Sequence, residues 1–351
     1  MDLEDLGYGK EFEDYGKVYN AEGLVIARVL AEHKERYVVR TEKLELEAEI
    51  TGNLRFTATE RADFPAVGDW VAVSVFEDQL ALIHRILPRK SILQRKAVGK
   101  FGEKQIIATN IDCVFIVMAV DRDFNPNRLE RYLTLAHSGH VEPLVLLSKT
   151  DLITEEELQD MVDTLWRKHE NLRIIPFSNH LAKGYGAIEA EIKKGRTYCV
   201  MGSSGVGKST LINHLAGKDI MKTGMISEST EKGRHVTSHR ELMVLEKGGI
   251  LIDTPGMREV GILEDIEKTF DDISALSDEC RFGDCTHTHE QGCAVLAALE
   301  DERIDPASYE NYIKMQRESE RLQATIAEKR KKEKDMGKMH KEYAKYKRRN
   351  S

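Results

Sequence analysis

The chain has 351 residues, enough for two or three domains, and its 32% charged and 7% aromatic residues are typical of a globular protein rather than a fibre or a disordered chain. No apolar run approaches the length of a membrane-spanning helix, and the N-terminus is acidic and polar, without a signal-peptide pattern. We therefore expect a cytoplasmic protein with no membrane contact.

The charge is unevenly distributed along the chain. The net charge of −8 argues against a protein that coats nucleic acid. Residues 321–351, however, carry twelve Lys or Arg against four Asp or Glu, a net charge of +8, which leaves −16 for the rest. A basic tail of this kind is compatible with docking to RNA, and a solvated charged helix explains it equally well.

Short alternating stretches fill the N-terminal part of the chain. After residues 1–21, which we expect to be an N-terminal extension, apolar and polar positions alternate in stretches broken by Gly, Pro and Asn. The pattern predicts a small β-barrel over residues 22–95, with a turn at 65–68 that leads into a strand over 69–76. Residues 90–100 are predicted to be a basic linker.

The middle of the chain, residues 101–264, alternates apolar runs with amphipathic segments. One helix is expected to end at Gly139, and another begins at Thr154, where Glu157 completes a capping-box pattern. Strands separated by helices of this length predict a parallel α/β sheet. The predicted strands are residues 114–120, 143–148, 173–178 and 197–202.

A phosphate-binding motif follows the last of these strands. Residues 202–209, GSSGVGKS, match G-x-x-x-x-G-K-[ST] between a strand and a helix, where glycines let backbone N–H groups surround phosphate oxygens. Lys208 is expected to reach the β- and γ-phosphates and to act in catalysis, and the Ser209 hydroxyl to bind Mg²⁺. The expected nucleotide contacts here are Gly202, Ser203, Ser204, Gly205, Val206, Gly207, Lys208, Ser209 and Thr210.

A second element of the phosphate site lies further along the chain. Asp253 ends an apolar strand and is followed by Thr254, Pro255 and Gly256. An acidic residue in this place can hold Mg²⁺ through water, and the Gly256 N–H can sense a γ-phosphate. The two elements together predict a site for a nucleoside triphosphate with Mg²⁺.

The base is indicated by a segment at the end of another strand, Ser148-Lys149-Thr150-Asp151. In GTPases the segment Asn-Lys-x-Asp lies at such a strand end, where the Asp binds the guanine N1 and N2 hydrogens and the Lys stem covers the base. Ser148 replaces the Asn, and we expect this change to weaken the bracing of the loop more than the Asp151 contact. A lone Lys-x-Asp is usually surface charge, so this segment alone does not establish GTP.

The order of the motifs along the chain decides whether residues 148–151 are plain surface charge or a base-reading segment. The base-reading segment and Ser178 precede the phosphate loop, the reverse of ordinary GTPases. This circular permutation, with a β-barrel before it and a Cys/His cluster behind it, resembles the ribosome small-subunit-dependent GTPase A family over residues 22–320. The resemblance implies an oligonucleotide-binding (OB) barrel, a permuted GTPase domain and a zinc-binding helical domain. It also implies a role in late maturation of the small ribosomal subunit, in contact with its rRNA.

The resemblance also implies a switch segment. The family has a His followed by two threonines, and this chain has His235-Val236-Thr237, so Thr237 is expected to bind Mg²⁺ when the γ-phosphate is present. Many GTPases orient the attacking water with a Gln, but Met257 holds that position here. His235 resembles the histidine proposed to replace it; the alternative is an exposed loop histidine. Slow turnover accelerated by the ribosomal subunit is the expectation.

Three of the five cysteines crowd together in residues 265–320, the expected helical domain. The pattern Cys280-x4-Cys285-x-His287-x5-Cys293 supplies the ligands of a structural Zn²⁺ site, with no open position for water. By chemistry alone His289 could replace His287, and the family pattern selects His287. Reduced cysteines without metal are the alternative. The remaining cysteines are expected to be core residues of strands: Cys113 and Cys199.

Three functions remain open from the sequence. The leading one is a monomeric GTPase that docks on the small ribosomal subunit through the barrel, the zinc-binding domain and the basic tail, with hydrolysis timing its release. The second is an ATP-dependent phosphotransferase that uses the same phosphate loop. The third is an RNA-binding switch protein that binds the nucleotide without hydrolysing it.

Overall fold

The computed structural model describes residues 1–33, 36–77, 79–96, 104–121, 124–217, 241–252 and 270–317. These residues divide into two compact units. The first unit draws on Met1–Gln94 and Ile106–Val260, and the second on Arg95–Gln105 and Gly261–Ser351. Among the described residues, no helix is both long enough and apolar enough to cross a membrane.

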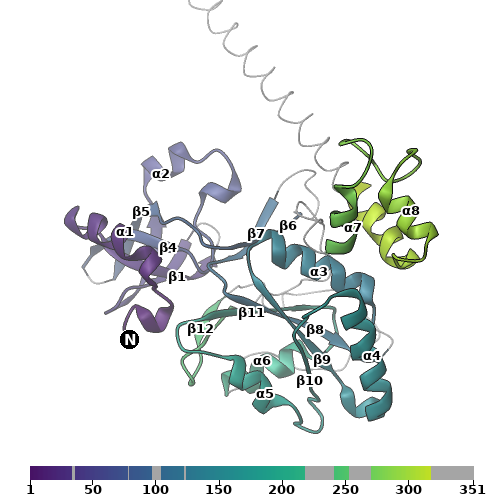
Figure 1. Ribbon diagram of the computed structural model, residues 1–351. Helices are drawn as coiled ribbons and strands as arrows, with labels where there is room; N and C mark the ends of the chain where they lie inside the picture. The colour runs from purple at the N-terminus through teal and green to yellow at the C-terminus, as the bar shows by residue number, and fades with distance from the viewer. Residues whose placement is uncertain are drawn as a thin grey trace, which may run out of the picture. The chain divides into compact units, whose positions relative to one another are not determined.

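The first unit contains the predicted β-barrel (Figure 1). Its strands close in the order β1-β2-β3-β5-β4, with β3 parallel to β5 and the other pairs antiparallel. This five-stranded closure confirms the OB-like barrel. Alternate side chains of each strand fill the interior, such as Leu46, Ala48 and Ile50 of β3. The strands are β1 (Val25–His33), β2 (Arg36–Arg40), β3 (Glu45–Ile50), β4 (Trp70–Phe76) and β5 (Leu80–Ile86).

The N-terminal residues, expected only as an extension, pack onto this barrel. A 3₁₀ turn (Glu4–Leu6) and helix α1 (Lys10–Ala21) bury Leu6 and Phe12 against Trp70 of β4. Two further helices follow β3, α2 (Gly52–Thr57) and a 3₁₀ turn (Arg61–Asp63). The first residues of the chain therefore form a second apolar cluster on the outside of the barrel, separate from its interior.

The segment expected to be a basic linker contains a strand. Within residues 90–100, β6 (Ile92–Lys96) pairs with β7 (Lys104–Thr109) in a two-stranded sheet. Leu93 is fully buried, and so are Ile107 and Ala108 of β7. The prediction of a linker is therefore wrong for residues 92–96, because buried apolar side chains hold this strand in the protein.

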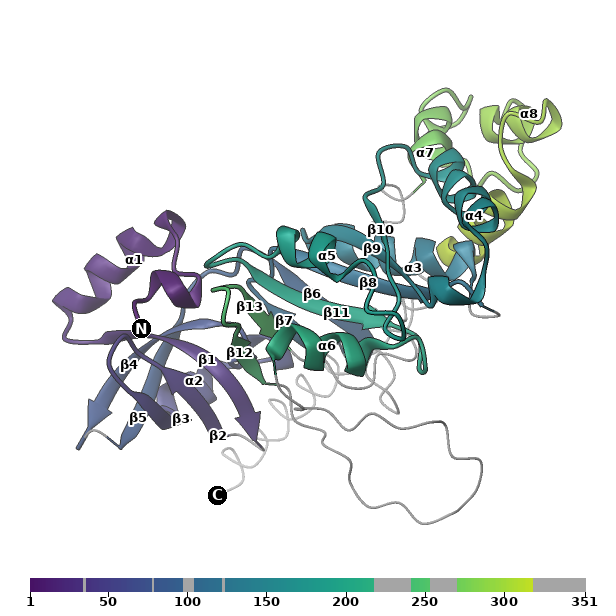
Figure 2. The same ribbon diagram turned by 90° about the horizontal axis from the view of Figure 1, so that it is seen from below.

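The central domain is a six-stranded sheet in the order β10-β9-β8-β11-β13-β12, parallel except for the antiparallel edge strand β12. Buried side chains of α3 and α4 pack on one face, and those of α5 and α6 on the other (Figure 2). The four predicted strands and the parallel sheet are confirmed. Strand bounds are β8 (Cys113–Ala119), β9 (Glu142–Ser148), β10 (Ile174–Pro176), β11 (Thr197–Gly202), β12 (Leu242–Val244) and β13 (Ile250–Ile252).

Local sequence sets the helix ends in this domain. Thr154 and Glu157 form the predicted capping box at the start of α4, and the Asn125 side chain caps α3, where proline follows. Gly139 ends α3 as predicted. The helices are α3 (Pro126–Ser138), α4 (Glu155–Lys168), α5 (Tyr185–Glu191) and α6 (Lys208–Ala216).

A buried arginine joins the barrel to the central sheet. Arg28 of β1 is 1% exposed, and its guanidinium donates hydrogen bonds to the carbonyls of Leu6, Gly68 and Asn110. It also donates to the Thr197 hydroxyl at 2.9 Å, at the start of β11. Burial lowers the pKa of Arg28 to about 10, while nearby carboxylates act against that shift. One side chain thus ties the N-terminus, the barrel and the strand that leads to the phosphate loop.

We expect Arg28→Met to lower the free energy of unfolding of the first unit by about 3 kcal/mol, because buried acceptors would lose their donor. Urea denaturation followed by tryptophan fluorescence measures this, since the guanidinium lies 5.4 Å from the Trp70 ring centroid. Arg85→Met, at an exposed arginine of β5, is the matched control and should change the midpoint little. Equal stability of the two variants would contradict the structural role of Arg28.

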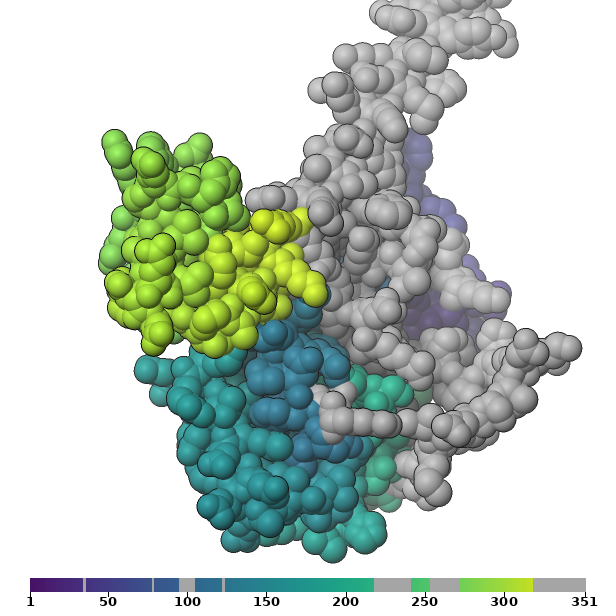
Figure 3. Space-filling model, turned by 90° about the vertical axis from the view of Figure 1, so that its right-hand side faces the viewer, coloured from purple at the N-terminus to yellow at the C-terminus, as the bar shows by residue number. Residues whose placement is uncertain are grey.

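The second unit contains a small helical domain in residues 270–317. Helices α7 (Asp271–Ser277), α8 (Ala294–Glu300) and a helix over 306–317 surround one core. In Figure 3 this domain forms a closely packed body, coloured green to yellow. The core is built from Phe270, Ile273, Val295, Ala298, Ile304, Tyr312 and Met315. A core of this size is small for an independent domain and favours a bound metal as additional support.

Candidate nucleotide site and metal centre

The phosphate loop connects β11 with α6 at the carboxyl ends of the parallel strands (Figure 1). Gly202, Gly205 and Gly207 have φ of +143°, +80° and +98°, values that favour glycine. A Cβ on Gly202 would lie 2.2 Å from the Val117 carbonyl oxygen of β8. Glycine at position 202 therefore lets the loop begin directly against the neighbouring strand.

Lys208 lies where a phosphate-binding lysine is expected. Its Nζ donates to the Gly202 carbonyl at 2.8 Å and also to the Ser203 carbonyl, so the ammonium group lies against the loop. Ser204 and Gly205 are exposed, as is Thr210, while Ser209 is half-buried at the start of α6. An open loop at a helix N-terminus, beside a lysine, can bind an anion such as a phosphate chain.

Ser148 contacts the phosphate loop directly. It is the last residue of β9 and is fully buried, and its hydroxyl donates to the Val206 carbonyl at 2.7 Å. We expected the change from Asn to Ser to weaken the bracing of this region. The hydroxyl nevertheless retains a hydrogen bond between the base-reading segment and the phosphate loop.

The other residues of the base-reading segment lie around the same strand ends. Asp151 accepts a hydrogen bond from the Ser178 hydroxyl, which joins two segments predicted to read the base. Lys149 has φ of +62°, and its Nζ lies 2.8 Å from an Asp121 carboxylate oxygen. The Thr150 N–H donates to the Phe177 carbonyl at 3.4 Å. A carboxylate held in this way can accept hydrogen bonds from a guanine base.

Two residues at the loop were not predicted. Arg128, in the first turn of α3, donates from Nη1 to the Ser203 hydroxyl at 2.7 Å. Asn179, next to Ser178, donates from Nδ2 to the Gly207 carbonyl at 3.2 Å. No motif marks Arg128, because its partner lies far along the chain. Asn179 directly follows Ser178, which was predicted to contact the nucleotide, and this neighbouring position is the signal by which the sequence could have identified it.

Several predicted residues lie outside the part of the chain that the structure describes. They are His235, Thr237, Asp253, Gly256 and Met257, together with the basic tail at 321–351. Their predicted roles remain predictions. The strand that leads to Asp253 is present as β13, which pairs with β11 in parallel register.

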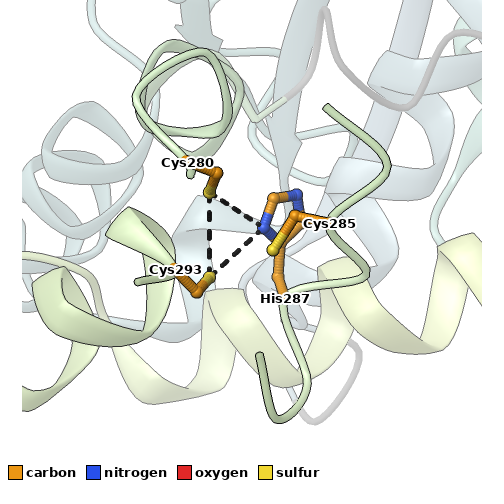
Figure 4. A group of neighbouring side chains, drawn as sticks. All are labelled: Cys280, Cys285, His287 and Cys293. Carbon is orange, nitrogen blue, oxygen red and sulfur yellow. Dashed lines mark hydrogen bonds between the residues drawn. The ribbon is translucent and has the colours of Figure 1, made fainter. Parts of the chain in front are cut away.

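The three clustered cysteines and His287 form a compact group (Figure 4). The His287 Nδ1 lies 3.6 Å from the Cys280 Sγ and 3.4 Å from the Cys293 Sγ, and those sulfurs are 3.8 Å apart. A tetrahedral ion with usual Zn–S and Zn–N lengths requires about 3.8 Å between sulfurs and about 3.5 Å from sulfur to nitrogen. The four residues fit such an ion, and the cluster can hold a metal.

Neighbouring groups support these ligands. The backbone N–H groups of Ala294 and Leu296, at the start of α8, donate to the Cys280 and Cys293 sulfurs, each at 3.4 Å. The Ser277 hydroxyl lies 3.2 Å from the His287 Nε2 and orients the ring. His289 is exposed and lies outside the group, with its Nδ1 beside the Thr288 hydroxyl.

The other two cysteines are core residues, as predicted. Cys113 and Cys199 are buried in the neighbouring strands β8 and β11. Burial raises the pKa of the Cys113 thiol to about 12, and it raises that of Cys199 well above its usual value. Both thiols therefore stay protonated at neutral pH and are poor metal ligands.

The fold and the loop together define a P-loop nucleotide-binding protein, and the segment predicted to read the base, residues 148–151, precedes the phosphate loop. A family model described as RsgA GTPase matches residues 86–263, which is half of the chain. A second, described as 50S ribosome-binding GTPase, matches residues 197–336. The chain is 41% identical over 331 residues to the small ribosomal subunit biogenesis GTPase RsgA of Opitutus terrae, covering 91% of this chain and 90% of that relative. It is 40% identical over 342 residues to the small ribosomal subunit biogenesis GTPase RsgA 2 of Vibrio parahaemolyticus, covering 96% and 91%.

Solved structures agree with this assignment. The crystal structure of YjeQ from Thermotoga maritima is similar with a TM-score of 0.65 and 25% identity, covering 84% of this chain and 98% of that chain. YloQ, described as a circularly permuted GTPase, has a TM-score of 0.61 and shares the fold at 23% identity, covering 85% and 95%. The chain belongs to the RsgA GTPase family and is a GTPase with a permuted motif order.

Proposed function

We propose that this GTPase acts in late maturation of the small ribosomal subunit and that the subunit stimulates its hydrolysis of GTP. The proposal rests on similarity along the whole chain, because the relatives that match over 91% and 96% of it bear the name small ribosomal subunit biogenesis GTPase. The match to the 50S ribosome-binding description begins at residue 197 and includes neither the barrel nor the base-reading segment. The whole-chain relatives are therefore the better guide to the partner.

The proposed site binds GTP with Mg²⁺. Lys208 would hold the β- and γ-phosphates and stabilise charge in the transition state, and His235 would orient the attacking water in place of Met257. Ser209, Thr237 and Asp253 would hold the Mg²⁺, which would neutralise charge on the phosphates. The proposed nucleotide contacts are Ser148, Lys149, Thr150, Asp151, Ser178, the loop residues from Gly202 to Thr210, Asp253 and Gly256.

We assign zinc to the group formed by Cys280, Cys285, His287 and Cys293. Three thiolates and an imidazole favour Zn²⁺ over harder cations, and four protein ligands make it a structural site. Zinc would cross-link the chain between α7 and α8 and so stabilise the helical domain.

The remaining assignments concern domain bounds, partner contacts and compartment. We propose that the monomeric protein contacts rRNA of the subunit in the cytoplasm through its barrel, its zinc-binding domain and its basic tail. The barrel supports this proposal because OB folds bind oligonucleotides. The proposed bounds are 1–21 for the N-terminal segment, 22–95 for the barrel, 101–264 for the GTPase domain, 265–320 for the zinc-binding domain and 321–351 for the tail.

Asp151→Asn should change the base that the site accepts. An amide cannot accept from both the N1 and N2 hydrogens of guanine, and its NH₂ would face a donor, so GTP affinity should fall about a hundredfold. Xanthine carries a carbonyl oxygen in place of the 2-amino group, so XTP should bind the variant better than GTP does. Competition against a fluorescent nucleotide measures both affinities.

Asp160→Asn, at an exposed carboxylate of α4, is the matched control for this substitution and should bind GTP as the unchanged protein does. An Asp151→Asn variant with unchanged GTP affinity would contradict the base assignment. If the unchanged protein prefers ATP to GTP, the guanine assignment fails and the ATP-dependent phosphotransferase is favoured.

The ribosomal role is tested by measuring phosphate release with and without purified small subunits. We expect the subunit to raise the turnover rate, and large subunits to serve as the control. If small subunits change neither the rate nor the binding, the ribosomal proposal fails while the nucleotide site remains. If phosphate release stays at the background rate with and without subunits, the result would favour a switch protein that binds the nucleotide without hydrolysing it.

A further inference from the structure

Two successive carbonyl groups of the phosphate loop each accept a side-chain hydrogen bond, one from the base-reading segment and one from the residue that follows Ser178. The Val206 carbonyl accepts from the Ser148 hydroxyl at 2.7 Å, and the Gly207 carbonyl accepts from the Asn179 amide at 3.2 Å. Ser148 lies at the end of β9, and Asn179 follows β10 in the next loop of the sheet. The loop is therefore held from two neighbouring strand ends at adjacent residues.

The orientation of the Asn179 amide is set by a second contact. The Tyr185 hydroxyl donates to the Asn179 Oδ1, which makes that atom the acceptor and leaves the NH₂ group to face the phosphate loop. Tyr185 is 6% exposed and its ring stacks on His214 of α6, with the centroids 3.6 Å apart and the planes at 19°. A packed tyrosine thus holds the amide in the geometry that the loop requires.

The close approach of Asn179 depends on the glycine at position 207. A Cβ on this residue would lie 2.2 Å from the Asn179 Nδ2, closer than two such atoms can come. The φ of +98° at Gly207 also favours glycine. The last glycine of the motif therefore makes room for Asn179 as well as for the turn into α6.

We propose that Asn179 is a positioning residue. Together with Ser148 it holds the phosphate loop in place, a role that a single asparagine at position 148 would fill in an Asn-Lys-x-Asp segment. The serine side chain has one hydroxyl donor and no amide, and Asn179 supplies an amide donor from the adjacent loop. Because Asn179 follows Ser178, the partner of Asp151, it couples the loop that reads the base to the loop that holds the phosphates. This inference rests on the proposed guanine nucleotide site.

The test compares nucleotide binding in the unchanged chain, three single variants and one double variant. Asn179→Ala should raise the dissociation constants of GTP and GDP about tenfold, since it leaves the Gly207 carbonyl without this donor. Tyr185→Phe should also raise both dissociation constants, by a smaller factor than Asn179→Ala does. Gln159→Ala, which removes an exposed amide on α4, is the matched control and should leave both constants unchanged.

The decisive variant adds Ser148→Asn to Asn179→Ala. If one asparagine at position 148 can replace the pair, the double variant should recover most of the lost affinity, which a general loss of stability would not allow. Thermal denaturation without nucleotide checks that the variants remain folded. Unchanged affinity in Asn179→Ala, or a loss that Ser148→Asn does not recover, would overturn the inference. Failure of the unchanged protein to bind GTP would instead overturn the proposed nucleotide site.

Discussion

Replacing Lys208 with alanine is expected to lower the rate of GTP hydrolysis by about 10²- to 10³-fold, the loss seen when one preorganised donor to a transition state is removed. The Nζ lies against the loop at the Gly202 and Ser203 carbonyls, so its charge is already positioned at the proposed phosphate site. Phosphate release at saturating GTP, with and without small ribosomal subunits, measures the effect.

Lys194→Ala is the control for this substitution. Lys194 lies shortly before the same strand, is 70% exposed and pairs with Asp5, so its loss removes a lysine without affecting the loop. Hydrolysis by this variant should match that of the unchanged protein. A Lys208→Ala variant that retains turnover within about twofold would show that this lysine does not act on the transition state.

Much of the central domain could be predicted from the sequence because its signals are local. The strands β8, β9 and β11 each contain a continuous apolar run, since both faces of a parallel sheet are buried. The glycines of the phosphate loop are fixed by backbone geometry within a few residues. Features of this kind leave a signature in a short stretch of chain.

Strand β3 leaves a weaker signature, and within the predicted barrel no strand was assigned to its residues specifically. Its sequence ELEAEI has glutamate at every second position, which looks like a solvated segment. In the barrel these glutamates face outward, and two of them form ion pairs with β2, Glu45 with Arg40 and Glu49 with Arg36. Only the pairing of β3 with β2 shows that its alternating buried and exposed side chains are those of a barrel strand.

The residues that were hardest to predict form hydrogen bonds with partners that lie far away in the sequence. Arg28 contacts Thr197, and Asn179 contacts Gly207, through hydrogen bonds that no local pattern announces. Arg28 is also an exception to the tendency of arginine to stay exposed. Motifs therefore located the site, whereas the residues that brace it emerged only from the fold.

Removal of the proposed zinc ion is expected to unfold the domain in residues 270–317 while nucleotide binding by the first unit persists. The domain has a small core, and structural zinc contributes about 10–16 kcal/mol of binding free energy that couples to folding. The first unit has separate cores on both faces of its sheet and in the barrel. A zinc-selective chelator, added with Mg²⁺ kept in excess, should therefore reduce helical circular dichroism and expose this domain to protease, with GTP affinity changed by less than about threefold.

Two neighbouring histidines provide a matched test of the ligand set. His287→Ala should lose the metal and unfold the domain, because the imidazole lies within 3.6 Å of two thiol sulfurs. His289→Ala should retain one equivalent of zinc, since this exposed side chain lies outside the group. Metal analysis of the two purified variants distinguishes them directly. Full zinc content in His287→Ala would refute the proposed ligands, and loss of GTP binding on chelation would mean that the two units do not fold independently.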